Sequence, residues 1–108
     1  MRNEIPQLTV TELKQRMDNG EDLYLLDVRE PWEHQIANLG GKLIPMNEVP
    51  HRLSEIERDR EIIVHCRVGR RSQRVAEFLR RAGYDNVANL SGGIHAWADQ
   101  VDSSLPKY

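Results

Sequence analysis

Short, continuously apolar segments recur along the chain and predict buried β-strands. Residues 24–28 and 62–64 are too short and too uniformly apolar for surface helices, so we expect strands inside a sheet. Two further short apolar segments, residues 43–44 and 87–90, predict two more strands. Strands that are apolar on both faces need helices on both sides of the sheet to shield them from water.

Amphipathic segments lie between these strands and predict the helices. A first helix begins after Thr9 or Thr11, either of which could cap it, and ends at Asn19 and Gly20, which tolerate left-handed backbone angles. The other expected helical segments are a short turn opened by Pro31, residues 47–58 with Asn47 as the cap, a helix from about Ser72 to Gly83, and a last helix over 94–101.

The alternation of strands and helices favours a small α/β domain with a mostly parallel sheet. In such a sheet, a functional site lies at the carboxyl ends of the strands. A chain of 108 residues with 39% hydrophobic residues is enough for one core. We expect a single domain over residues 1–108, with a core over about 8–100 and a short C-terminal tail over 101–108.

Charge and hydropathy limit the cellular location and the classes of partner that we expect. The apolar runs are only a handful of residues long and the chain begins with a polar stretch, which argues against a membrane span or a secretory signal. We therefore expect a cytoplasmic protein without a membrane partner. The net charge is −2, which argues against nucleic acid as a partner.

The single cysteine, Cys66, limits the available chemistry. One thiol cannot form an internal disulfide, a Cys-x-x-Cys redox pair or a cysteine-based zinc site. The four histidines also lack the spacing of a local metal motif. We expect no metal and no cofactor, so any chemistry of Cys66 must use that thiol alone.

The segment around Cys66 carries the strongest chemical signal. It runs from a predicted strand through a loop with Gly69 into a predicted helix, whose free N–H groups and dipole favour a thiolate. The alternative is a buried structural cysteine beside a solvated helix face. Four arginines favour the reactive interpretation, since the stretch 62–76 lacks carboxylates: Arg67, Arg70, Arg71 and Arg74.

Three motifs, taken in order, resemble those of a single-domain rhodanese. Residues 27–33 (DVREPWE) resemble the early D-x-R-E-x-x-E motif of that family, residues 65–72 (HCRVGRRS) its active-site loop, and residues 90–97 (LSGGIHAW) its closing G-G-x-x-x-W motif. Residues 37–42 depart from the family, because the histidine that many rhodaneses carry there is missing. That stretch is similar to rhodanese domains attached to enzymes that activate sulfur-carrier proteins.

The resemblance implies a fold and a site. The fold would be a three-layer α/β/α domain with a five-stranded, mainly parallel sheet. Cys66 would be the catalytic nucleophile and persulfide carrier. The substrate would contact the loop that follows: Arg67, Val68, Gly69, Arg70, Arg71 and Ser72. Cysteine phosphatases have H-C-x5-R, which would need arginine at position 72, whereas here Arg71 gives C-x4-R.

The expected function is transfer of a sulfane sulfur from thiosulfate or a related small anionic donor. The acceptor would be a thiol, a protein or cyanide, and it must be external because no second cysteine can resolve the persulfide. One alternative is a persulfide carrier or docking module without turnover, in sulfur-carrier activation for molybdopterin, thiamin or a similar pathway. Another is a cysteine phosphatase or arsenate reductase.

Residues outside the loop could support it. Asp27 ends a neighbouring strand and could orient the loop or pair with an arginine, although it could equally cap the following turn. Arg29, two residues further on, is a second candidate for support of the loop. Alternation along the strand points His65 away from Cys66, which argues against a catalytic role for His65. Trp32 and Trp97 are interpreted as packing residues.

Overall fold

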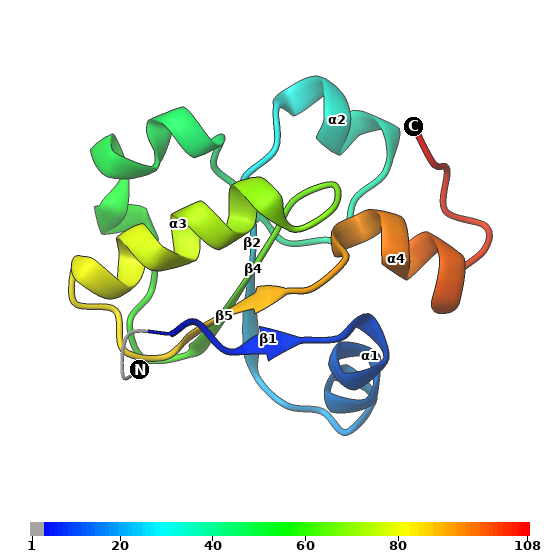
Figure 1. The fold of residues 1–108 in the computed structure, drawn as a ribbon, viewed down its shortest axis with the longest axis horizontal. Coiled ribbons are helices and arrows are strands. Elements are labelled where there is room, and N and C mark those ends of the chain that lie inside the picture. Colours follow the sequence, from blue (N-terminus) through cyan, green and yellow to red (C-terminus); the bar gives the residue numbers. More distant parts are fainter. Residues whose placement is uncertain (1–3) are drawn as a thin grey trace.

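The computed structural model describes residues 4–108 and contains a five-stranded sheet in the order β1-β5-β4-β2-β3 (Figure 1). All four strand pairings are parallel. The expected α/β class and five-stranded parallel sheet are therefore confirmed. The strands are β1 (Gln7–Leu8), β2 (Leu23–Asp27), β3 (Lys42–Leu43), β4 (Glu61–His65) and β5 (Val87–Leu90).

Within the described part of the chain, four α-helices connect or flank the strands. They are α1 (Val10–Asp18), α2 (Pro31–Ile36), α3 (Arg70–Arg81) and α4 (Gly93–Gln100). Thr9 is the residue that caps α1, and it forms a reciprocal capping box with Glu12. Pro31 stands in the first turn of α2, where its missing N–H costs nothing. Each helix matches an expected segment: α2 continues beyond the expected short turn to Ile36, and the other boundaries are shifted by one or two residues.

The expected α-helix over residues 47–58 is wrong. This segment forms two short 3₁₀-helices, η1 (Met46–His51) and η2 (Leu53–Glu55), and Asn47 does not cap either one. Their backbone bonds span three residues, as in Glu48 N to Pro45 O at 2.8 Å. Pro50 lies inside η1 and has no N–H to continue an α-helical ladder.

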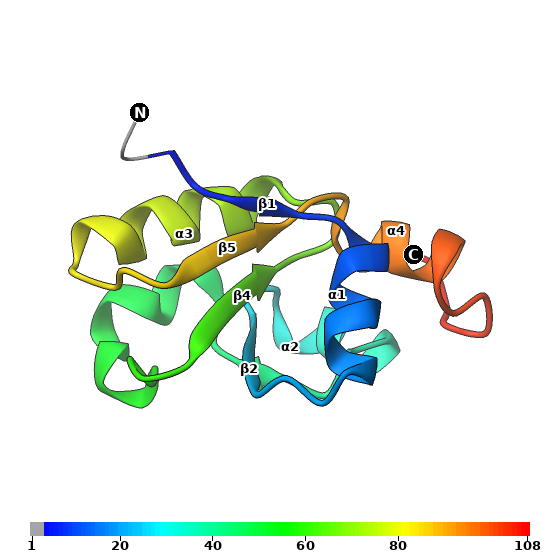
Figure 2. The same ribbon diagram turned by 90° about the horizontal axis from the view of Figure 1, so that it is seen from below.

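The sheet is covered on both faces, which gives three layers. Figures 1 and 2 show α3 with the two 3₁₀-helices on one face and α1 with α4 on the other. The first face buries one apolar cluster that includes Leu26, Val64 and Leu79. The second face buries another around Leu13 and Ile63. Burial on both sides explains why the strands are continuously apolar in sequence.

Strand β4 lies at the centre of the sheet, and the loop between β4 and α3 begins at its carboxyl end. Helix α2 follows the neighbouring strand β2 and lies beside the same edge (Figure 1). This edge therefore receives the early motif and the cysteine loop together. No helix within residues 4–108 is long and apolar enough to cross a membrane.

Candidate active site

Cys66 lies at the bottom of the β4–α3 loop, with only 1% of its surface exposed. The backbone N–H of Gly69 points to its Sγ at 3.1 Å, and the N–H and hydroxyl oxygen of Ser72 each lie 3.4 Å from it. Burial alone would raise the pKa of the Cys66 thiol, but hydrogen bonds from Ser72, Gly69 and Val68 outweigh burial and lower the pKa. The loop is therefore built to hold an anionic sulfur.

The loop keeps this shape because one of its own residues and the first residue of α4 are glycines with positive φ. Gly69 has φ +103° and precedes the first turn of α3. Gly93, with φ +60°, opens α4 so closely that a Cβ there would lie 2.5 Å from the carbonyl oxygens of Cys66 and Arg67. Those two carbonyls accept N–H groups of Ile94 and His95, both at 3.0 Å. With the carbonyls held outward, the following amides can point inward to the sulfur.

Arg71 is fixed beside the loop by the carboxylate of Glu33. The two Arg71 Nη atoms donate to Glu33 Oε1 and Oε2 at 2.7 and 2.9 Å. The Arg71 guanidinium holds the pKa of Glu33 at about 2, although partial burial acts in the opposite direction. Arg71 also interacts electrostatically with Cys66, so this cation supports the thiolate.

Asp27 and Arg29 form a buried ion pair next to this network. Arg29 Nε and Nη2 donate to the two carboxylate oxygens of Asp27 at 2.9 and 2.8 Å. Burial would raise the pKa of Asp27, but hydrogen bonds from Arg29 and His34 contribute to lowering it to about 2. The Arg29 backbone N–H also donates to the Asp27 carboxylate, so this carboxylate takes part both in an ion pair and in a cap of the turn.

The C-terminal segment joins the two ion pairs. The Tyr108 hydroxyl accepts from Arg29 at 2.8 Å and donates to Glu33 at 2.9 Å, and the Tyr108 carbonyl accepts from Arg67. Tyr108 also lies edge-on to Trp32, with ring centroids 5.9 Å apart. Residues 101–108 are expected to be only a tail, yet they end against the residues that flank the cysteine loop.

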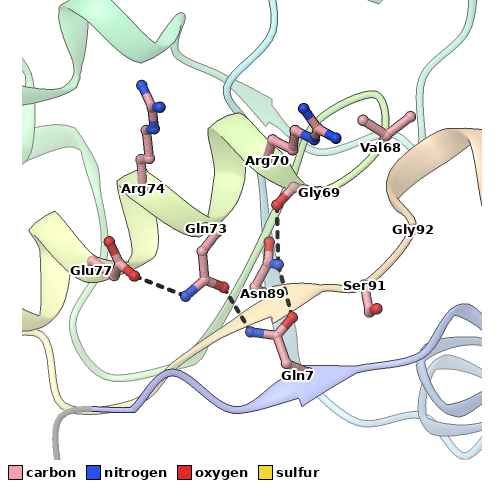
Figure 3. Close-up of a pocket in the computed structure, with 10 residues that line it drawn as sticks. All are labelled: Gln7, Val68, Gly69, Arg70, Gln73, Arg74, Glu77, Asn89, Ser91 and Gly92. Atoms are coloured by element: carbon pink, nitrogen blue, oxygen red, sulfur yellow. Dashed lines mark hydrogen bonds between the residues drawn. The ribbon is translucent and has the colours of Figure 1, made fainter.

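Two recesses flank the loop. One has a volume of about 470 Å³ and is lined by Glu30, Trp32, Glu33, Arg67, Arg71 and Tyr108. The other has about 540 Å³ and lies where the loop and α3 meet β1 and β5 (Figure 3). Val68 and Arg70 line the second recess, and the Val68 side chain is 45% exposed. The predicted loop residues are thus divided among three places: the contacts around Cys66 Sγ and the walls of the two recesses.

Several side chains differ from the expectations or were not foreseen. Trp97 packs in the core, whereas Trp32 is 59% exposed, so the packing interpretation is wrong for Trp32. His65 is fully buried, and burial lowers its pKa to about 4. Glu33 lies within the early motif but was given no role from sequence. Asn89, a polar residue inside a predicted buried strand, was also missed, although that unusual placement was a usable signal.

The described residues offer no ready metal site. Among residues 4–108, no group of three or more His, Cys, Asp or Glu side chains is placed to hold a metal ion.

The fold and the cysteine loop define a rhodanese-like domain. The model of the rhodanese-like domain family matches residues 9–100, so the chain belongs to the rhodanese-like family of sulfurtransferases. A sulfurtransferase of Allochromatium vinosum is 41% identical over 95 residues, covering 87% of this chain and 89% of that protein. The crystal structure of a rhodanese-like domain protein of Staphylococcus aureus has a TM-score of 0.83 at 30% identity, covering 96% and 99% of the two chains.

Other relatives contain a matching region within a longer chain. An adenylyltransferase and sulfurtransferase of Zea mays is 34% identical over 113 residues, covering 97% of this chain but 23% of that protein. The chain spans between 26% and 54% of several other curated relatives that it matches.

Proposed function

We propose that the chain moves a sulfane sulfur from thiosulfate or a related anionic donor to an external acceptor through a persulfide on Cys66. One observation carries this proposal: the N–H groups of Gly69 and Ser72 converge on Cys66 Sγ at 3.1 and 3.4 Å. Such a ring of amides favours a thiolate before the reaction and a persulfide anion after it.

The reaction divides into two balanced displacements. The Cys66 thiolate attacks the outer sulfur of thiosulfate, the S–S bond of the donor breaks, and sulfite leaves with the electron pair of that bond. Cys66 then carries a persulfide with one negative charge. An acceptor thiolate or cyanide attacks the outer sulfur, and the Cys66 thiolate is the leaving group. No oxidant or reductant is consumed.

The arginines beside the loop supply charge for an anionic donor. Arg67 and Arg71 line the recess of about 470 Å³, and Arg70 lines the recess on the other side of the loop. Within the proposal they attract the donor and compensate charge as sulfite leaves. A free thiolate persists in a reducing compartment, so we place the reaction in the cytoplasm.

A protein acceptor is a second form of the same proposal. Trp32, which lines the same recess as Arg67, is 59% exposed, and Val68 in the cysteine loop is 45% exposed, whereas Cys66 itself is only 1% exposed. Exposed apolar side chains around a buried reactive atom suit docking of a protein that brings its own acceptor group. The Zea mays relative, which is called both an adenylyltransferase and a sulfurtransferase, supports a role in sulfur-carrier activation.

The test is intact-mass measurement after incubation with thiosulfate. We expect the wild-type protein to gain one sulfur atom that cyanide removes as thiocyanate, and Cys66→Ser to gain none. Loading by a cysteine desulfurase without thiosulfate turnover would identify a persulfide carrier instead. Absence of loading from both donors, together with Cys66-dependent hydrolysis of an aryl phosphate or Cys66-dependent arsenate reduction, would overturn the sulfur-transfer proposal.

A further inference from the structure

Ser72 has two acceptors for a single hydroxyl hydrogen. Its side chain is fully buried, and its Oγ lies 2.5 Å from Asn89 Oδ1 and 3.4 Å from Cys66 Sγ. A hydroxyl donates only one hydrogen bond at a time. The shorter and stronger contact is with Asn89, so the Ser72 hydrogen is drawn toward the amide, in competition with the weaker bond to the sulfur that helps to lower the pKa of Cys66.

The orientation of the Asn89 amide follows from its other contacts. Both hydrogens of Nδ2 have acceptors, Gln7 Oε1 at 2.9 Å and the Gly69 carbonyl at 3.3 Å. The remaining atom, Oδ1, therefore faces Ser72 and can only accept. Asn89 is 3% exposed, so water has little access with which to replace these bonds.

The hydrogen bonds of Asn89 belong to a chain of side-chain amides that reaches the protein surface, and every amide in it donates in the same direction. Gln7 Nε2 donates to Gln73 Oε1 at 2.7 Å, and Gln73 Nε2 donates to Glu77 Oε2 at 3.0 Å. Figure 3 shows this line of side chains crossing the recess from Glu77 on α3 to Gln7 on β1 and Asn89 on β5. Because an ionised carboxylate only accepts, Glu77 sets the donor direction of every amide behind it.

The direction of the chain matters for the charge state of Cys66. A protonated thiol can donate its own hydrogen to the Ser72 oxygen, and a persulfide carries its charge on the outer sulfur. Only the free thiolate gains from a hydrogen bond donated by the Ser72 hydroxyl to Sγ. To donate that bond, Ser72 must give up its hydrogen bond to Asn89 Oδ1. The ionisable groups next to Cys66 in the chain or beside its loop are His65 on β4 and three arginines, Arg67, Arg70 and Arg71, and none of them is a member of the amide chain.

We propose that Asn89 is a positioning residue for the chemistry of Cys66: its side-chain oxygen holds the Ser72 hydrogen and withholds it from the free thiolate. The amide chain thereby moderates the stabilisation of the free Cys66 thiolate by the loop amides, relative both to the protonated thiol and to the loaded persulfide. The part that concerns the persulfide rests on the proposed sulfur transfer, whereas the part that concerns the thiol does not.

The test is the pH dependence of Cys66 alkylation by iodoacetamide, followed by intact mass, which reads the thiolate directly because the chain has one cysteine. In Asn89→Leu, Ser72 is free to donate to the sulfur, so we expect the midpoint to move down by about 0.5–1 pH unit. Gln7→Leu removes the group that orients Asn89 and should move the midpoint in the same direction by less. Ser91→Ala, which lines the same recess, is the matched control and should leave the midpoint unchanged.

Two further measurements separate this role from a merely structural one. In a Ser72→Ala background, Asn89→Leu should produce no additional change in the alkylation midpoint, because the Ser72 hydroxyl hydrogen is absent. Cyanide should discharge persulfidated Asn89→Leu a few times faster than wild type, because a better-stabilised thiolate leaves more readily.

An unchanged or raised midpoint in folded Asn89→Leu would overturn the proposal, and if that variant does not fold, the same result in Gln7→Leu would do so. Alkylation needs no sulfur donor. A wild-type protein that shows these midpoints but takes no sulfur would therefore refute the proposed function and leave the Asn89 role standing.

Discussion

The Tyr108 hydroxyl donates a hydrogen bond to the Glu33 carboxylate at 2.9 Å, across 75 positions of sequence. Glu33 in turn holds Arg71, which interacts electrostatically with Cys66. A residue of the expected tail is thus two contacts away from the cation that supports the thiolate. The position of Arg71 depends on a contact that closes only when the C-terminal segment packs.

Removal of the Tyr108 hydroxyl should affect stability and sulfur loading together. In Tyr108→Phe the bonds to Arg29 and Glu33 are lost, and we expect the free energy of unfolding to fall by about 1–2 kcal/mol. Loading from thiosulfate should slow a few-fold because Glu33 holds Arg71 less firmly. Tyr84→Phe is the matched control, since its hydroxyl donates at 2.9 Å to the Leu53 carbonyl away from the loop. An equal change of loading in both variants would contradict this link.

The two adjacent arginines Arg70 and Arg71 should differ in effect. Arg71→Gln leaves the Glu33 carboxylate, which is 4% exposed, without its bidentate partner, and should cost about 2 kcal/mol in urea unfolding. Its loading rate should fall about tenfold, because a cation next to the reacting sulfur is lost. Arg70→Gln removes the same charge from the exposed side of the loop and should change stability by less than about 0.5 kcal/mol. Similar unfolding curves for the two variants would rule out the Glu33 pair as a determinant of stability.

Two glycines with positive φ should respond differently to alanine. Gly20, with φ +80°, has open space around it, so Gly20→Ala should cost only the backbone strain of about 1 kcal/mol. In Gly93→Ala the new Cβ meets two carbonyl oxygens at 2.5 Å, and we expect a loss of about 3 kcal/mol or more, together with loss of sulfur loading. Thermal unfolding and loading assays on both variants test this difference. A Gly93→Ala protein with wild-type loading would show that the α4 contact does not shape the loop.

Stability should fall in two steps as the pH decreases. Burial lowers the pKa of His65 from 6.5 to about 4, so the unfolded chain binds more protons between these values and unfolding becomes easier as pH falls through this window. Asp27 and Glu33 have pKa values lowered to about 2, so the stabilisation they provide is lost between about pH 4 and 2.

The variant His65→Leu should lack the first of these two steps. Neither ring nitrogen of His65 has a hydrogen-bond partner among the described residues, so the apolar replacement should fold. Urea unfolding at pH 7, 5 and 4 measures the difference, which we expect to reach about 1–3 kcal/mol. The same loss of stability in wild type and variant between pH 7 and 4 would place the first step elsewhere.

The sequence predicts the architecture of this protein well where local patterns act alone. The apolar segments mark four strands, but β1 is only two residues long and is defined by its pairing with Asn89 and Leu90. The predicted α-helix over 47–58 is wrong because the same amphipathic spacing also fits a 3₁₀-helix, and Pro50 interrupts the α-helical hydrogen bonds. Element type is thus predictable from periodicity, whereas short pairings and helix type depend on tertiary contacts.

The cysteine loop is predictable from sequence because the strand, the glycine and the start of the helix are adjacent in the chain. The side chains that hold the loop in place are not predictable in this way. Glu33 meets Arg71 across 38 positions and Asn89 meets Gln7 across 82, and neither partner is marked by a local pattern. Trp32 shows the reverse error: a large aromatic side chain favours a packing role, whereas Trp32 is largely exposed.

The contact between α4 and the loop carries a consequence for synthesis of the chain. The carbonyls of Cys66 and Arg67 are held by the N–H groups of Ile94 and His95, almost thirty residues downstream. A nascent chain that has exposed Cys66 but not yet this helix has no closed ring of amides to activate the thiol. The cysteine emerges from the ribosome as an ordinary thiol and acquires its reactivity only after the last quarter of the domain has folded onto it.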